Sequence, residues 1–193
     1  MAREVANAGL LLAPGAGADR TQSALLAIDT AVTACGIPVE RMDFPYRKAG
    51  RRAPDREAVL VASVRSEAKM LAARAGVGEG RLVLGGRSMG GRMCSIAVAE
   101  GLPALGLVLV SYPLHPPGKP EKLRVAHFEG LHVPCLFISG NRDSFGTVGE
   151  LEAAATAIPG PVTHVWIDGK DHGMRGADAR VAEVVRDWII TLV

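Results

Sequence analysis

Short apolar runs alternate with longer amphipathic stretches along almost the whole chain. The predominantly apolar runs are too short for helices and are typical of buried strands; they cover residues 8–13, 37–44, 81–85, 104–110, 133–139 and 163–167. The amphipathic stretches carry apolar residues at helical spacing; they cover residues 19–35, 55–75, 89–100, 150–157 and the chain from about residue 177. Strands that alternate with helices predict a parallel sheet covered on both faces, a three-layer α/β/α sandwich of about six mostly parallel strands.

A single domain over residues 1–193 is the organisation that this pattern predicts, because no repeat or change of composition divides the chain. The longest irregular stretch, residues 112–132, is proline-rich and is a candidate wall for a site. In open parallel sheets, ligands bind in the loops at the carboxyl ends of the strands. We therefore expect the functional residues in loops that directly follow a strand.

Composition excludes several classes of protein. Hydrophobic residues make up 48% of the chain and charged residues 22%, which is typical of a folded domain. The formal net charge of +2 gives no reason to expect a nucleic-acid or membrane partner. The sequence shows no signal-peptide pattern, and three scattered cysteines favour a reduced compartment, so we expect a cytoplasmic protein without metal or other cofactor.

Residues 86–90 (Gly-Arg-Ser-Met-Gly) match G-x-S-x-G between a predicted strand and a predicted helix. In this context the serine lies on a sharp turn, and the flanking glycines let the strand and helix backbones come close together. The hydroxyl of Ser88 would then be exposed above the sheet. The amide of Met89 would lie at a helix N-terminus, where it can stabilise an oxyanion. The alternative is a glycine-rich turn with an inert serine.

A serine hydroxyl needs a base to take its proton, and the base needs an acid to orient it. In sheets with such an elbow, the acid and then the base follow the nucleophile along the chain. Asp143 follows the fifth predicted strand and His172 follows the sixth, so both meet the expectation. Asp143 as a turn residue and His172 as a solvated loop residue are the alternatives. The other candidates fit the order less well: His127, His132, His164, Asp168 and Asp171.

The loop after the first strand, residues 15–17 (Gly-Ala-Gly), leaves backbone amides accessible. We predict Ala16 as the second oxyanion donor and Gly17 as a pocket residue. The same loop resembles the start of a dinucleotide fingerprint, G-x-G-x-x-G, with an acidic residue, Glu40, toward the end of the next strand. Arg20 stands where the third glycine belongs, which argues against that interpretation.

Charged and polar residues near these loops are candidates for the substrate pocket. Arg87 and Arg92 flank the elbow and could pair with carboxylates or steer an acidic substrate. His115 follows the fourth strand, and we predict that it lines the pocket. Residues 47–56 contain a basic run that we interpret as solvated surface rather than an anion site.

Several motifs together resemble the α/β-hydrolase superfamily, near the dienelactone-hydrolase-like group of small hydrolases. They are an H-G-A-G-like loop at 14–17, G-R-S-M-G-G at 86–91, Y-P-x-H-P-P-G-K-P at 112–120 and G-x-R-D-x-F-G at 140–146. The resemblance implies Ser88 as nucleophile, Asp143 as acid and His172 as base. It also implies a minimal six-stranded fold without a cap domain between the fourth and fifth strands, and hence an open site.

Two positions depart from the family pattern. Pro14 stands where a histidine is frequent, and Ser88 stands where dienelactone hydrolases use cysteine, so lactone specificity does not follow.

The function expected from these residues is that of a serine hydrolase, which cleaves a small carboxylic ester or related acyl substrate through an acyl-enzyme. Two alternatives stay open: an acyltransferase with the same triad, and a hydrolase-fold binding or scaffold protein whose triad is vestigial. An uncovered edge strand would allow two copies of the chain to form a homodimer.

Overall fold

The computed structural model describes residues 7–193. The strands are β1 (Gly9–Ala13), β2 (Val39–Arg41), β3 (Leu82–Arg87), β4 (Gly106–Val110), β5 (Cys135–Gly140) and β6 (Val162–Ile167). The α-helices are α1 (Ser23–Thr33), α2 (Pro45–Lys48), α3 (Glu57–Ala75), α4 (Met89–Ala99), α5 (Val148–Ala155) and α6 (Asp178–Ile190). Two 3-10 turns, η1 (Glu79–Arg81) and η2 (Phe128–Gly130), lie in the connections.

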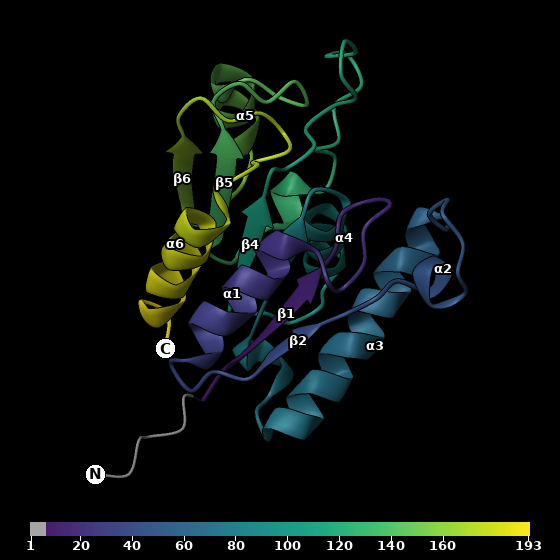
Figure 1. The fold of residues 1–193 in the computed structure, drawn as a ribbon, viewed down its shortest axis with the longest axis vertical. Coiled ribbons are helices and arrows are strands. Elements are labelled where there is room, and N and C mark those ends of the chain that lie inside the picture. The colour runs from purple at the N-terminus through teal and green to yellow at the C-terminus, as the bar shows by residue number, and fades with distance from the viewer. Residues whose placement is uncertain (1–6) are drawn as a thin grey trace.

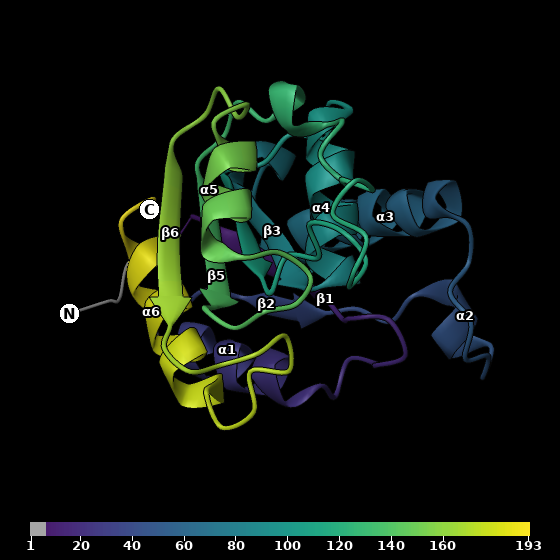
Figure 2. The ribbon, with the colours of Figure 1, turned by 90° about the horizontal axis from the view of Figure 1, so that it is seen from above.

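The six strands form one sheet in the order β2-β1-β3-β4-β5-β6, and every neighbouring pair is parallel. Helices α1 and α6 cover one face of the sheet, while α3, α4 and α5 cover the other (Figures 1 and 2). The predicted three-layer sandwich is therefore confirmed. The carboxyl ends of all six strands lie along one edge, where their following loops gather.

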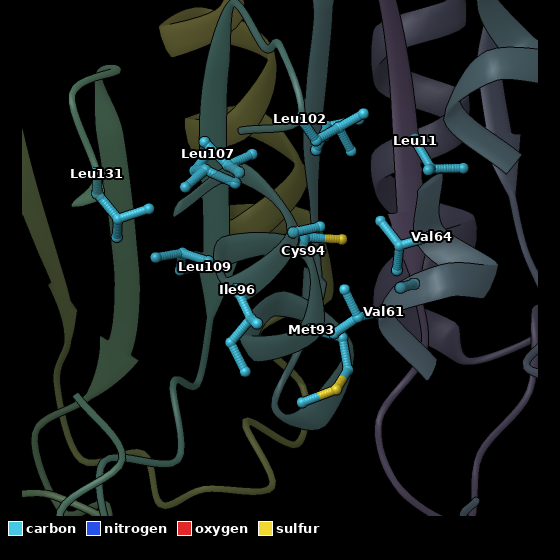
Figure 3. Close-up of a cluster of buried hydrophobic side chains, with 14 of the residues drawn as sticks. Leu11, Val61, Val64, Met93, Cys94, Ile96, Leu102, Leu107, Leu109 and Leu131 are labelled. Carbon is cyan, nitrogen blue, oxygen red and sulfur yellow. The ribbon is translucent and has the colours of Figure 1, made fainter. Parts of the chain in front are cut away.

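Successive side chains of each central strand point to opposite faces of the sheet, so the core has two halves, one beneath α1 and α6 and the other beneath α3, α4 and α5. In β1, Leu10 and Leu12 face α1 and α6, whereas Leu11 faces α3 and α4. Figure 3 shows part of the half next to α3 and α4, where Met93 and Cys94 of α4 lie among side chains of the sheet and of α3. The central strands are buried on both faces, which explains their nearly continuous apolar sequence.

The segment between β4 and β5, residues 111–134, contains only the turn η2, so no cap domain covers the carboxyl edge of the sheet there. This agrees with the minimal fold expected from the family resemblance. None of the helices within residues 7–193 is both long enough and apolar enough to cross a membrane.

Two local predictions were wrong, and one short helix was missed. Helix α1 begins at Ser23 rather than at Asp19, because the Asp19 carboxylate accepts the backbone N–H of Thr21 at 2.9 Å and closes a turn before the helix. The second strand spans only Val39–Arg41 rather than residues 37–44. The residues after it turn away from the sheet edge into the short helix α2, which Pro45 begins and which the sequence pattern did not reveal.

Candidate active site

Ser88 lies on the tight turn between β3 and α4, at the carboxyl edge of the sheet. Its φ of 50° and ψ of −117° form a backbone conformation that residues other than glycine rarely adopt. The neighbouring glycines make the turn sterically feasible. A Cβ on Gly86 would lie 2.0 Å from the carbonyl oxygen of Ala13, and one on Gly90 would lie 2.1 Å from the same oxygen. The predicted elbow is therefore present, with β1 packed directly against it.

Three side chains from distant parts of the chain meet at this turn. The Oγ of Ser88 lies 2.9 Å from Nε2 of His172, and Nδ1 of the same ring lies 2.8 Å from Oδ2 of Asp143. An ionised carboxylate only accepts hydrogen bonds, so Nδ1–H donates to Asp143 and leaves Nε2 to accept the Ser88 hydroxyl. Asp143 is buried, with 3% of its surface exposed, whereas Ser88 and His172 are partly exposed to solvent.

The loops that carry Asp143 and His172 are tied to each other beyond the ends of β5 and β6. The Asn141 side chain donates to Asp168 at 2.7 Å and accepts the Gly169 N–H at 2.8 Å. The Arg142 N–H donates to the Lys170 carbonyl at 2.9 Å. Asp168 therefore holds the loops together rather than serving as the acid, and the distance between Asp143 and His172 is fixed by backbone as well as by side chains.

Phe145 holds the imidazole of His172, and Arg87 holds the backbone of the same residue. The Phe145 ring stacks on the His172 ring with 3.9 Å between the ring centroids. The backbone N–H of Phe145 donates to Asp143 Oδ1 at 2.8 Å. The guanidinium of Arg87 donates to the backbone carbonyl of His172. Burial lowers the pKa of Arg87, and the nearby carboxylates of Asp178, Asp143 and Asp171 oppose that effect. The histidine is therefore packed and anchored before any substrate arrives.

The predicted oxyanion donors, Met89 and Ala16, both border the space next to the Ser88 hydroxyl. Met89 is the first residue of α4, so its N–H has no acceptor within the helix. Within residues 7–193, the N–H of Ala16 donates to no other protein group either. Gln22 shapes this loop from behind, because its side chain accepts the N–H of Gly15 at 3.0 Å.

A cavity of about 420 Å³ opens at these residues. Its lining comprises Gly15, Ala16, Gln22, Arg87, Ser88, Met89, Arg92, Pro113, Arg124, Phe145 and His172. Arg87 lines it as predicted, but Gly17 does not: its N–H faces the hydroxyl of Tyr46 at 3.4 Å. His115 does not line it either.

The prediction for His115 was wrong because its segment folds behind the loop that carries Asp143. The His115 N–H donates to the Phe145 carbonyl at 3.0 Å, and the ring Nδ1 lies 2.9 Å from the Pro116 carbonyl. Its Nε2 lies 3.5 Å from Glu150, at the start of α5, and only 5% of the residue is exposed. His115 therefore supports the site from the rear and does not reach the cavity.

A second serine–histidine contact, Ser95 with His127, lies in α4 and the loop before η2. The Ser95 Oγ is 2.8 Å from His127 Nε2, but the residue is fully buried and its hydroxyl is also 2.8 Å from the Arg92 carbonyl. Within the described residues no carboxylate forms a hydrogen bond with His127. Burial, followed by the charge of Arg92, lowers the pKa of His127 to about 4. This pair lacks both an acid and access to the cavity, so we interpret it as structural.

The other sequence candidates have ordinary partners. Glu40, the acidic residue of the possible dinucleotide site, forms ion pairs with Arg20 and Arg74 at 3.4 and 2.6 Å. In the basic run of residues 47–56, Arg47 and Lys48 pair with Asp19 and Glu67. No group of three or more potential metal ligands comes together in the part of the chain that the structure describes.

Four lining residues were not singled out by the sequence analysis: Gln22, Pro113, Arg124 and Phe145. Phe145 had a usable signal, since the aspartate two positions before it closes a turn by accepting the Phe145 N–H. Pro113 and Arg124 lie in the irregular stretch, where no periodicity indicates which side chains face the sheet edge.

A parallel sheet in this order, with a serine on a glycine-flanked turn after β3 and an aspartate and a histidine after β5 and β6, defines the α/β-hydrolase class. Comparison with protein-family models agrees: the chain belongs to the alpha/beta hydrolase domain family, whose model matches residues 6–184.

Solved structures share the fold at low sequence identity. An alpha-beta serine hydrolase homologue from Coxiella burnetii is 16% identical with a TM-score of 0.76, and the match covers 94% of this chain and 84% of that one. Dienelactone hydrolase from Anabaena variabilis is 17% identical with a TM-score of 0.76, covering 95% and 86%. Est1E from Butyrivibrio proteoclasticus is 15% identical with a TM-score of 0.78, covering 96% and 88%.

Proposed function

We propose that the protein is a serine hydrolase that cleaves a small carboxylic ester or related acyl substrate, with Ser88 as nucleophile, His172 as base and Asp143 as the acid that orients it. The observation that carries this proposal is the continuous contact from Ser88 Oγ to His172 Nε2 at 2.9 Å and from His172 Nδ1 to Asp143 at 2.8 Å. This geometry suits proton removal from the serine without rearrangement of the loops.

The reaction follows in two steps. The Ser88 hydroxyl gives its proton to His172 Nε2 as Oγ bonds to the acyl carbon, while the Met89 and Ala16 amides stabilise the oxyanion. His172 then gives the proton to the leaving oxygen as the ester bond breaks, which leaves an acyl-serine. A water molecule, deprotonated by His172, attacks this intermediate and releases the acid, and the proton returns to Ser88 Oγ.

Acyl transfer to an alcohol or a thiol would use the same residues, since the cavity is open to other nucleophiles. A binding or scaffold protein with an unused triad is a different class of function. The partial exposure of Ser88 and His172 favours an enzyme, because both reacting atoms border the cavity. The names of the structural neighbours, among them a serine hydrolase homologue and a dienelactone hydrolase, lie in the same field of chemistry.

A fluorophosphonate probe tests the proposal directly, because it phosphonylates only a serine whose base is in place. We expect labelling of the wild-type protein at Ser88, loss of labelling in Ser88→Ala, and a decrease of at least about 1,000-fold in His172→Ala. Hydrolysis of 4-nitrophenyl esters from acetate to decanoate should fall in parallel. Products formed with added alcohols or thiols separate hydrolysis from transfer.

Ser95→Ala is the matched control, since it removes the hydroxyl of the other serine–histidine pair. It should keep both labelling and ester hydrolysis. A folded wild-type protein that neither reacts with the probe nor hydrolyses any ester would favour the scaffold, and labelling that moved to Ser95 would contradict the assignment.

A further inference from the structure

Three arginines line the cavity beside Ser88: Arg87, Arg92 and Arg124. No carboxylate is among the lining residues of the described chain. Of the three, only Arg92 forms an ion pair with a carboxylate within residues 7–193, and that partner is Glu57 at the start of α3. A small cavity next to Ser88 therefore carries an excess of positive charge. The three arginines differ in the protein groups that they contact.

Arg87 already has a task. Its guanidinium donates to the His172 carbonyl, and three carboxylates lie near enough to stabilise its charge. We assign it as a positioning residue that holds the histidine loop rather than as a group that recognises substrate.

Arg124 is held in place by its backbone, and its side chain forms no ion pair within residues 7–193. The Tyr112 hydroxyl donates to the Arg124 carbonyl at 2.7 Å, and the Arg124 N–H donates to the Leu114 carbonyl at 2.8 Å. One terminal nitrogen of the guanidinium lies 3.4 Å from the Pro113 carbonyl. Because Tyr112 is buried directly after β4, these bonds fix Arg124 against the carboxyl edge of the sheet although it lies far along an irregular loop.

Arg92 lies one helical turn beyond the nucleophile, since its N–H donates to the Ser88 carbonyl at 3.1 Å. Partial burial of Arg124 and the positive charge of Arg92 both lower the pKa of Arg124, burial having the larger effect. The Nε of Arg92 is buried and has no hydrogen-bond partner in the described residues. Arg92 and Arg124 thus line the same cavity, and within the described residues only Arg92 is paired with a carboxylate, that of Glu57, which leaves about one uncompensated positive charge on this wall.

We propose that Arg92 and Arg124 together bind a carboxylate of the substrate. Guanidinium groups pair with carboxylates through two parallel N–H···O bonds, and a single negative charge matches the single uncompensated charge of this wall better than a doubly charged phosphate does. The preference for charged esters rests on the proposed hydrolase function. Binding of a carboxylate by Arg92 and Arg124 can be measured without hydrolysis.

Two pairs of esters test the preference and locate the carboxylate. Mono-4-nitrophenyl adipate and its methyl ester differ by a charge on the acyl side, while 4-acetoxybenzoate and its methyl ester differ by a charge on the leaving group. In one of the two pairs we expect kcat/KM for the anionic ester to exceed that for the neutral one by about 10-fold or more. Arg124→Gln and Arg92→Gln should each reduce that ratio by about 10-fold.

Arg180→Gln is the control, because it removes the same charge from an exposed pair with Glu183 on α6. It should leave the ratio unchanged in both pairs of esters. Equal rates for charged and neutral esters in the wild-type protein would overturn the carboxylate site and leave the proposed hydrolase function intact.

Binding of uncleavable amides tests the carboxylate site without requiring that the protein be a hydrolase. The monoanilide of adipic acid and 4-acetamidobenzoate carry the same carboxylates, and isothermal titration calorimetry should show that one of them binds at least about 10-fold more weakly to Arg124→Gln. Such binding in a protein that hydrolyses no ester would refute the hydrolase and support the carboxylate site. Binding of neither amide, or binding unaffected by Arg124→Gln, would overturn the site.

Discussion

At the scale of single residues, the backbone of Ser88 is strained by the sharp turn between β3 and α4 that carries it. Its φ and ψ of 50° and −117° match the first central residue of a type II′ turn, which is normally glycine. The strain persists because the Ser88 N–H donates to the Val110 carbonyl at 2.8 Å and α4 starts at the next residue. Strain of this kind is common where a reactive group must be presented at a fixed point.

Replacing Ser88 by glycine should therefore relieve this backbone strain, whereas replacing it by alanine should not. We expect the free energy of unfolding of Ser88→Gly to exceed that of Ser88→Ala by about 1–3 kcal/mol, because only glycine lacks the Cβ that is strained at this φ. Urea denaturation of both variants measures the difference. Both lack the hydroxyl, so a lost contact with His172 cancels between them; equal stability would show that the turn carries no strain.

At the scale of elements, the close contact between β1 and the start of α4 holds Ser88 above the sheet. Gly90→Ala would place a Cβ 2.1 Å from the Ala13 carbonyl oxygen and 2.6 Å from that of Pro14, and both are backbone atoms that cannot rotate away. We expect a loss of more than about 3 kcal/mol in the free energy of unfolding, or no folded protein.

Gly149→Ala gives the opposite result in the same experiment. Gly149 lies in α5, and a Cβ added there would meet no atom within 4 Å, so alanine should stabilise the protein by up to about 1 kcal/mol. Thermal unfolding followed by circular dichroism compares the two variants. A Gly90→Ala protein as stable as the wild type would contradict the close contact that positions the elbow.

The elements were predictable from the sequence where burial dictates the pattern. Central strands buried on both faces must be apolar, and helices that cover a sheet must show a periodic apolar face, so β1, β3, β4, β5 and the long helices were found. The edge strand β2 was predicted too long, because an edge strand is only half covered and its polar residues resemble those of the loop that follows. Asp19 was misplaced because a turn and a helix cap favour the same residue type.

At the scale of the whole molecule, three residues of the site could be predicted to lie together from the order of strands and loops along the chain. Parallel strands bring Ser88, Asp143 and His172 to one edge, and a sequence that shows the strands also shows which loops meet there. Arg124 could not be found in this way. Hydrogen bonds with Tyr112 and Leu114 fix it beside the cavity on a long irregular loop, and such contacts leave no periodic trace in the sequence.

The same loop makes the stability of the whole molecule depend on pH. Burial, and after it the positive charge of Arg92, lowers the pKa of His127 in the folded protein to about 4, compared with about 6.5 in an unfolded chain. Between these values the unfolded state binds more protons than the folded state. The stability contributed by neutral His127 is therefore fully present above about pH 6.5 and is lost as the pH falls through the window toward 4.

His127→Gln should flatten this dependence, since glutamine does not titrate but can still donate to the Ser95 hydroxyl. We expect the decrease in unfolding free energy between pH 7.5 and 4.5 to be smaller in the variant by about 1–2 kcal/mol, after allowance for the partial exposure of the ring. Urea denaturation at both pH values measures it, with the exposed His132→Gln as control, which should behave as the wild type does. All other ionisable groups are the same in the wild type and in His127→Gln, so a difference between these two curves reports on His127. An unchanged dependence in His127→Gln would show that His127 does not contribute to the loss of stability in acid, and it would contradict the burial of a neutral imidazole beside Ser95.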